Sequence, residues 1–174
     1  MTENNPTITT LHNLLDYDAR KFTSAEIQLK KSLHEWINKA GSLKLKNVLH
    51  KYLDFVHQHV QKMDGFFEEE QISSLSLANK IMQAFIEETE QKLAACTDAE
   101  VKDASLLAGI QTINHFKISM YGTAAAFANA LGMEKQAKVF HEAEVNEKQI
   151  DDRLSQLAEF EINVRAKAPI TLHA

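Results

Sequence analysis

Turn-forming residues and cysteine are scarce in this 174-residue sequence. Five glycines and two prolines make up 7 of the 174 residues, well below the average share of roughly 12%. Sandwiches, barrels and many-stranded α/β folds need many tight turns, so this shortage argues against them and favours long helices. The one cysteine, Cys96, excludes an internal disulfide and a cysteine-rich zinc site. Nothing therefore indicates an oxidising compartment, and we expect a cytoplasmic protein.

Long apolar runs and a positively charged face are also missing. No stretch approaches the ~18 apolar residues of a membrane span, and the first ten residues, MTENNPTITT, lack the features of an export signal. We expect no membrane association. The 19 basic side chains are scattered among 24 acidic ones, so no nucleic-acid partner is expected. No nucleophile triad or phosphate-binding glycine loop points to a small-molecule substrate.

What the sequence does have is apolar residues at every third or fourth position, which is typical of amphipathic helices. The pattern predicts a single all-α domain over residues 11–165, between a disordered segment at 1–10 and a tail at 166–174. The predicted helices span about 11–39, 43–71, 77–95, 99–131 and 133–164. Helices of about 30 residues joined by short turns favour a four-helix bundle of two antiparallel hairpins, with 77–95 as an additional helix in the crossover.

The predicted helix ends carry suitable residues. Residues 40–42 (Ala-Gly-Ser) form a tight turn, residues 73–76 a longer break, and Gly132 a C-terminal stop. Thr97 and Glu100 have the spacing of a capping box, in which Thr97 accepts a free amide at the helix start.

Charged residues interrupt the apolar stripes of three predicted helices. Lys117 falls near the middle of one stripe, with Asn114 toward its edge, while Glu147 and Glu26 occupy the centres of two others. Asp151 lies one turn beyond Glu147. Because an isolated buried charge costs several kcal/mol, such residues are normally paired, neutralised or bound to metal. The alternatives are a capping-box role for Glu26 after Thr23, and a Lys117 side chain that reaches water from an apolar stem.

The 43–71 helix offers weaker candidates. Asp54 and His57 have the i, i+3 spacing of carboxylate–histidine pairs in di-iron bundles, but Asp54 lies away from the apolar stripe, which favours a surface hydrogen bond. His59 is flanked by aromatic residues and is interpreted as a core histidine rather than a metal ligand.

Two stretches, DASLLAGIQTINHFKISMYGTAAAFANALG at 103–132 and EVNEKQIDDRLSQLAE at 144–159, resemble the YciE/YciF-like proteins, small bacterial members of the ferritin-like superfamily. A weaker likeness covers SAEIQLKKSLHEW at 24–36. The resemblance implies a ferritin-like four-helix bundle, usually dimeric, associated with bacterial stress responses. It also implies inward carboxylates and histidines like those of a di-metal site, with Glu26, Glu147 and Asp151 at matching positions.

At other positions this chain departs from the family pattern. Tyr52 and Phe55 stand where relatives tend to have histidine and glutamate, and Asn114 and Lys117 fall within the segment where relatives have an inward Glu-His-x-Glu. A di-iron centre needs roughly four carboxylates and one or two histidines. We therefore expect no metal and no other cofactor, and we expect the Lys117 ammonium to pair with Glu147, with Glu26 or Asp151 sharing it.

These observations favour a non-enzymatic bundle protein with a degraded di-metal site. The alternative is an oxidase or peroxide-detoxifying enzyme that uses iron or manganese at the remaining carboxylates, and an iron-storage cage subunit is a third hypothesis. A homodimer is expected from the resemblance and from the broad apolar face that continues through Met120 and residues 124–128. The crossover helix could instead cover that face.

Overall fold

The computed structural model describes residues 7–72 and 77–167. Its elements, in chain order, are α1 (Leu11–Lys39), α2 (Leu43–Glu69), α3 (Lys80–Ala95), α4 (Ala99–Ala130), α5 (Glu134–Leu157), a π-helical turn (Ala158–Ile162) and α6 (Asn163–Ala166). The expected break at 73–76 and most of the two expected end segments lie outside the described residues.

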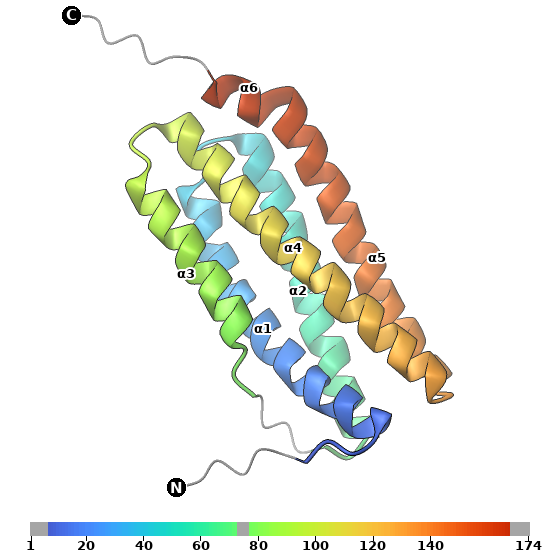
Figure 1. Ribbon diagram of the computed structural model, residues 1–174. Helices are drawn as coiled ribbons and strands as arrows, with labels where there is room; N and C mark the ends of the chain where they lie inside the picture. The colour runs from blue at the N-terminus through green and yellow to red at the C-terminus, as the bar shows by residue number, and fades with distance from the viewer. Residues whose placement is uncertain (1–6, 73–76, 168–174) are drawn as a thin grey trace, which may run out of the picture.

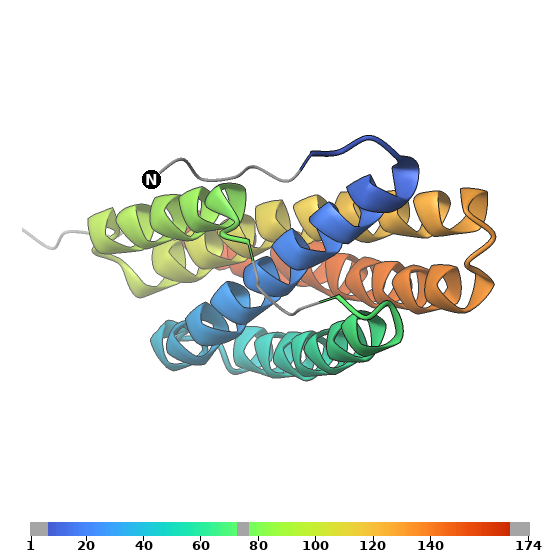
Figure 2. The same cartoon turned by 90° about the horizontal axis from the view of Figure 1, so that it is seen from below.

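Two antiparallel hairpins make the bundle, α1 with α2 and α4 with α5 (Figure 1). In the second view α1 crosses the other helices obliquely, and α2 lies beside α5 (Figure 2). The shorter helix α3 packs on α4 and α1. The all-α bundle with a crossover helix is therefore confirmed.

The predicted helix boundaries need small corrections. The second helix ends at Glu69 rather than near 71, and the third begins at Lys80 rather than 77 because Asn79 caps it. The last helix reaches Ala166, but a π-helical turn over Ala158–Ile162 interrupts it. A π turn holds more residues per turn than an α turn, so it shifts the faces of the residues that follow.

Polar side chains begin four of the helices. Thr10 accepts the amide of Asn13 at 3.0 Å, and Asn79 accepts that of Met82 at 2.9 Å. The capping box predicted at Thr97 is wrong. The N-cap of α4 is the next residue, Asp98, whose carboxylate accepts the amides of both Glu100 and Val101. Ser42 caps α2, and its hydroxyl accepts the amide of Leu45 at 3.3 Å.

Two helix ends use a left-handed residue. Gly132, with φ of 71°, follows α4, and the amide of Met133 donates to the carbonyl of Ala128 at 2.9 Å. This Schellman motif confirms the predicted stop at Gly132. Gln71 has the equivalent place after α2, with φ of 52°, although a side chain disfavours that conformation.

A glycine brings α3 close to α4. A Cβ atom added to Gly109 would lie 2.5 Å from the hydroxyl oxygen of Thr89, so a larger residue cannot be accommodated without movement. Nearby, the rings of Phe85 and Phe116 meet edge to face at 5.5 Å. The crossover helix is thus seated against the first half of α4.

The second half of α4 is covered by its own chain. Met120, Ala124, Ala125 and Ala128 are buried, and the ring of Tyr121 meets that of Phe22 from α1 at 5.9 Å. The apolar face expected to leave surplus surface for a second copy is therefore mostly used inside one chain. Among the described residues, no helix has both the length and the hydrophobicity needed to cross a membrane.

Candidate functional site

The bundle core contains a cluster of polar side chains contributed by all four long helices. Each member is at most 1% exposed. The members are Glu26 on α1, Tyr52 and His59 on α2, Asn114, Lys117 and Tyr121 on α4, and Glu147 on α5. We call this set the buried polar cluster. Each member projects from the apolar stripe of its helix, which is why folding brings them together.

Lys117 is the centre of the buried polar cluster. Its ammonium nitrogen donates to Oε1 of Glu147 and lies 3.1 Å from Oε1 of Glu26. The same nitrogen lies 4.7 Å from the centre of the Tyr52 ring, within the range of a cation–π contact. Lys117 is fully buried, so the interpretation that its ammonium reaches water is wrong.

Three further donors serve the two carboxylates. The Tyr121 hydroxyl donates to Oε1 of Glu26, and the Tyr52 hydroxyl donates to Oε2 of Glu147 at 2.6 Å. The amide nitrogen of Asn114 donates to Oε2 of Glu147 at 2.7 Å and to its backbone carbonyl at 2.9 Å. These charge-assisted hydrogen bonds offset the cost of removing both carboxylates from water.

His59 closes the remaining side of the buried polar cluster. Its Nδ1 lies 3.4 Å from Oε1 of Glu26 and 3.5 Å from Oε1 of Glu147. On the other side of the ring, the amide nitrogen of Asn146 donates to Nε2 at 3.3 Å. In that orientation the proton of a neutral imidazole sits on Nδ1 and faces the carboxylates.

These contacts set the protonation of the charged members. Burial alone would raise the pKa of Glu26, but Lys117, His59 and Tyr121 together lower it from 4.5 to about 2. Burial alone would lower the pKa of Lys117, but the two carboxylates reverse this and raise it. Glu26 is therefore ionised and Lys117 is protonated, and the two form a true ion pair.

The two tyrosines stay neutral. Burial and the adjacent carboxylates raise the pKa of the Tyr52 and Tyr121 hydroxyls well above 10, because a phenolate would lie beside a negative charge. Both hydroxyls can therefore act only as hydrogen-bond donors to the carboxylates.

The structure brings together most of the residues singled out from the sequence. Glu26, Tyr52, Asn114, Lys117 and Glu147 meet in the buried polar cluster. Glu26, rather than Asp151, is the second carboxylate on Lys117.

Two of the predicted positions do not contribute polar atoms to the cluster. Phe55 is buried beside it and stacks on the His59 ring, with centroids 6.4 Å apart. Asp151 has a side chain that is 25% exposed and lies 2.9 Å from Nε2 of His115 at the surface. Of the three carboxylates singled out from the sequence, Asp151 is the one that reaches solvent.

The other sequence interpretations can also be placed. The capping-box role for Glu26 is wrong because Thr23 lies inside α1, where its hydroxyl donates to the carbonyl of Ala19 at 3.2 Å. Asp54 and His57 are both exposed, away from the buried polar cluster.

Sequence reasoning missed the roles of two residues. Tyr121 lies within the stretch 103–132 that carries the family resemblance, but no role was predicted for it, although it lies four residues after Lys117 and therefore on the same face of α4. His59 is buried, as expected of a core histidine, but it faces two carboxylates. The sequence signal for Tyr121 was its spacing: a side chain with a hydroxyl, one helical turn after an inward lysine, faces the same part of the core.

A metal could use three of these side chains. Ligand atoms of Glu26, His59 and Glu147 lie within 4.8 Å of one another. Only two of the three, Glu26 and Glu147, are carboxylates, whereas a di-metal centre needs about four. The Lys117 ammonium also binds the two carboxylates that would have to hold an ion, and it stays charged there. The residues of the buried polar cluster therefore do not fit a di-metal centre.

Comparisons with known proteins agree with the resemblance read from residues 103–132 and 144–159. The family described as a domain of unknown function, DUF892, matches residues 10–167. Protein YciF of Escherichia coli strain K12 is 32% identical over 145 residues, which cover 83% of this chain and 87% of YciF.

Solved structures give the same result. The crystal structure of the E. coli stress protein YciF matches with a TM-score of 0.84 at 30% identity. The match covers 92% of this chain and 100% of the YciF chain. YcfI from Rhodopseudomonas palustris matches with a TM-score of 0.83 at 24% identity, covering 89% and 97% of the two chains, and this shows a shared fold.

Proposed function

This chain belongs to the DUF892 family, and we propose that it is a non-enzymatic, stress-associated bundle protein whose ferritin-like di-metal site has been replaced by a lysine–carboxylate network. The observation that carries this proposal is the position of Lys117. Its ammonium contacts Glu26 and Glu147 together in the fully buried interior of the bundle. The stress association is carried over from YciF, which is described as a stress protein.

The proposed role of the buried polar cluster is structural. A protonated lysine and two carboxylates joined by tyrosine and asparagine donors link α1, α2, α4 and α5. Such a network fixes how helices pack, since its donors must meet carboxylates that lie on other helices. Its lysine stays protonated and its tyrosines stay neutral, so none of them is an activated nucleophile of the kind that covalent catalysis needs.

Metal loading tests the proposal. Protein incubated with Fe(II) or Mn(II) and then separated from free ions should retain well under one ion per chain in the buried polar cluster. Glu147→Gln is the control, because an ion that this variant retains lies elsewhere. Two ions per chain that are lost in Glu147→Gln would contradict the proposal. Lys117→Glu, which adds a carboxylate in place of the cation, should recover weak metal affinity.

A second candidate function is favoured by the spacing of Glu26, His59 and Glu147. In this alternative the protein is an oxidase or a peroxide-detoxifying enzyme. The three residues supply the ligands of one iron or manganese ion, and a second ion would need donors that the buried polar cluster lacks. This alternative requires Lys117 to leave its present position. Ferroxidase and peroxide-consumption assays on iron-loaded protein separate the two functions, because the structural role predicts no activity above that of free iron.

We also propose a cytoplasmic location, which the single cysteine favours, and a homodimer, which the resemblance implies. The proposed dimer rests on the resemblance because α4 is largely covered within one chain. Sedimentation at micromolar concentration tests it, and a single monomeric species would contradict it.

A further inference from the structure

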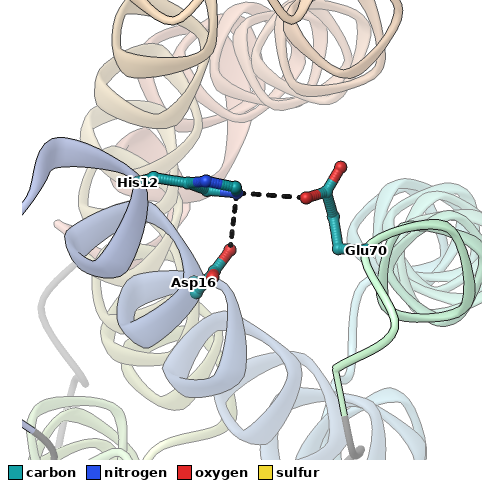
Figure 3. A group of neighbouring side chains, drawn as sticks. All are labelled: His12, Asp16 and Glu70. Atoms are coloured by element: carbon teal, nitrogen blue, oxygen red, sulfur yellow. Dashed lines mark hydrogen bonds and ion pairs between the residues drawn. The ribbon is translucent and has the colours of Figure 1, made fainter.

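A second group of titratable residues lies at the end of the bundle where α1 begins and α2 ends. His12 and Asp16 occupy successive turns of α1, and Glu70 follows the last residue of α2. Their side chains point toward one another across the gap between the two helices (Figure 3). The buried polar cluster shares no residue with this group.

The distances fit a bound ion. Nε2 of His12 lies 3.0 Å from Oε2 of Glu70 and 3.7 Å from Oδ1 of Asp16. All three ligand atoms lie within 4.8 Å of one another. Donor atoms about 2.1 Å from a zinc ion lie roughly 3.0–3.4 Å apart at octahedral to tetrahedral angles. Small side-chain movements would therefore give all three atoms a common ion.

Oδ1 of Asp16 has no hydrogen-bond partner within the described part of the chain, although the atom itself is buried. A buried carboxylate oxygen without a donor is costly. His12 offers it only a distant contact, because that imidazole nitrogen lies closer to Glu70. This oxygen faces the same point as the other two ligand atoms, so a cation there would satisfy it.

The charges around this point also favour a cation. The carboxylates of Asp16 and Glu70 both lie at this point, and the guanidinium of Arg20 lies near Asp16. The last carbonyls of α2 place a partial negative charge beside Glu70. Two carboxylates and the end of a helix thus outweigh the single guanidinium of Arg20.

We propose that His12, Asp16 and Glu70 bind one divalent cation of the zinc class and thereby join the start of α1 to the end of α2. The imidazole selects this class, since magnesium and calcium prefer oxygen ligands alone. Three protein ligands leave the remaining coordination positions to water. The side chains are 47%, 24% and 18% exposed, so the ion can enter from solvent.

Calorimetric titration of tag-free protein with zinc chloride at neutral pH tests the site. One ion should bind per chain, and zinc should raise the melting temperature, because an ion that binds only the folded state stabilises it. His12→Gln and Asp16→Asn should each weaken binding at least about tenfold and abolish the rise in melting temperature. His12 is exposed and Asp16 is partly exposed, and both changes keep the side-chain size similar.

His115→Gln is the matched control. His115 is an exposed histidine that lies 2.9 Å from the carboxylate of Asp151. It therefore matches the histidine–carboxylate contact of the proposed site but lacks the second carboxylate. Zinc binding that is unchanged in His115→Gln and lost in His12→Gln supports the proposal. Absence of saturable binding at millimolar zinc, equal affinity in His12→Gln, or loss of binding in Glu147→Gln instead would overturn it.

Discussion

The ammonium nitrogen of Lys117 lies 3.1 Å from Oε1 of Glu26, although the two residues are on different helices and both are fully buried. Glu147 binds the same ammonium from a third helix. A buried cation held between two carboxylates explains how the bundle tolerates charge at its centre. The lysine and the carboxylates also depend on one another, since removal of either partner leaves an uncompensated buried ion.

Lys117→Met should destabilise the fold by about 3–5 kcal/mol, because Glu26 and Glu147 would remain buried without their cation. Urea unfolding followed by circular dichroism measures this change. Lys62→Met is the control, since it removes an exposed ion pair with Glu142 and should have a much smaller effect. Equal effects of the two substitutions would show that Lys117 is solvated.

Stability should fall in acid because of Glu26. Its pKa is about 2 in the folded protein and near 4.5 without the cluster, so its contribution is present above about pH 4.5 and is lost as the pH falls toward 2. The unfolding free energy of Glu26→Gln should show less dependence on pH over this window than that of the unmodified protein. Parallel curves for the two proteins would contradict the shift.

Tyr121→Phe and Tyr52→Phe should each lower the unfolding free energy by about 1.5–3 kcal/mol, the range for hydrogen bonds to charged groups. Each substitution removes a hydroxyl donor from a buried carboxylate. Tyr17→Phe, outside the buried polar cluster, is the control and should have little effect. In an ultraviolet titration, Tyr52 and Tyr121 should not ionise while the protein stays folded.

The two left-handed helix ends predict opposite effects. Gln71→Gly should stabilise the protein, and Gly132→Ala should destabilise it, each by about 1 kcal/mol, because glycine adopts positive φ without steric cost. Thermal unfolding of the two variants measures both. A change of the same sign in both variants would show that backbone conformation does not control these ends.

Much of this fold follows from local patterns in the sequence. Apolar periodicity and turn residues predict five helices and their pairing, since long helices with short connections can only fold back on each other. The π-helical turn at Ala158–Ile162 was not predicted, because one extra residue in a turn changes the apolar pattern only slightly. Thr97 and Asp98 are both good caps, and only the structure shows that Asp98 takes the role.

Only part of the buried polar cluster could be predicted from the sequence. A helical wheel shows that Lys117, Glu26 and Glu147 face inward, but it does not show how far a neighbouring helix covers each position. Asp151 is offset by only about 40° from Glu147 on the wheel, yet it reaches the surface and pairs with His115. Tyr121 on an apolar face resembles a core aromatic until its hydroxyl partner is known.

The most direct measurement is a crystal structure of the protein soaked in Mn(II), with anomalous diffraction data collected at the manganese absorption edge. The lysine–carboxylate network predicts no anomalous peak between Glu26 and Glu147, with the Lys117 ammonium within hydrogen-bond distance of both carboxylates. A strong peak at that position, with the Lys117 side chain turned away toward solvent, would contradict it.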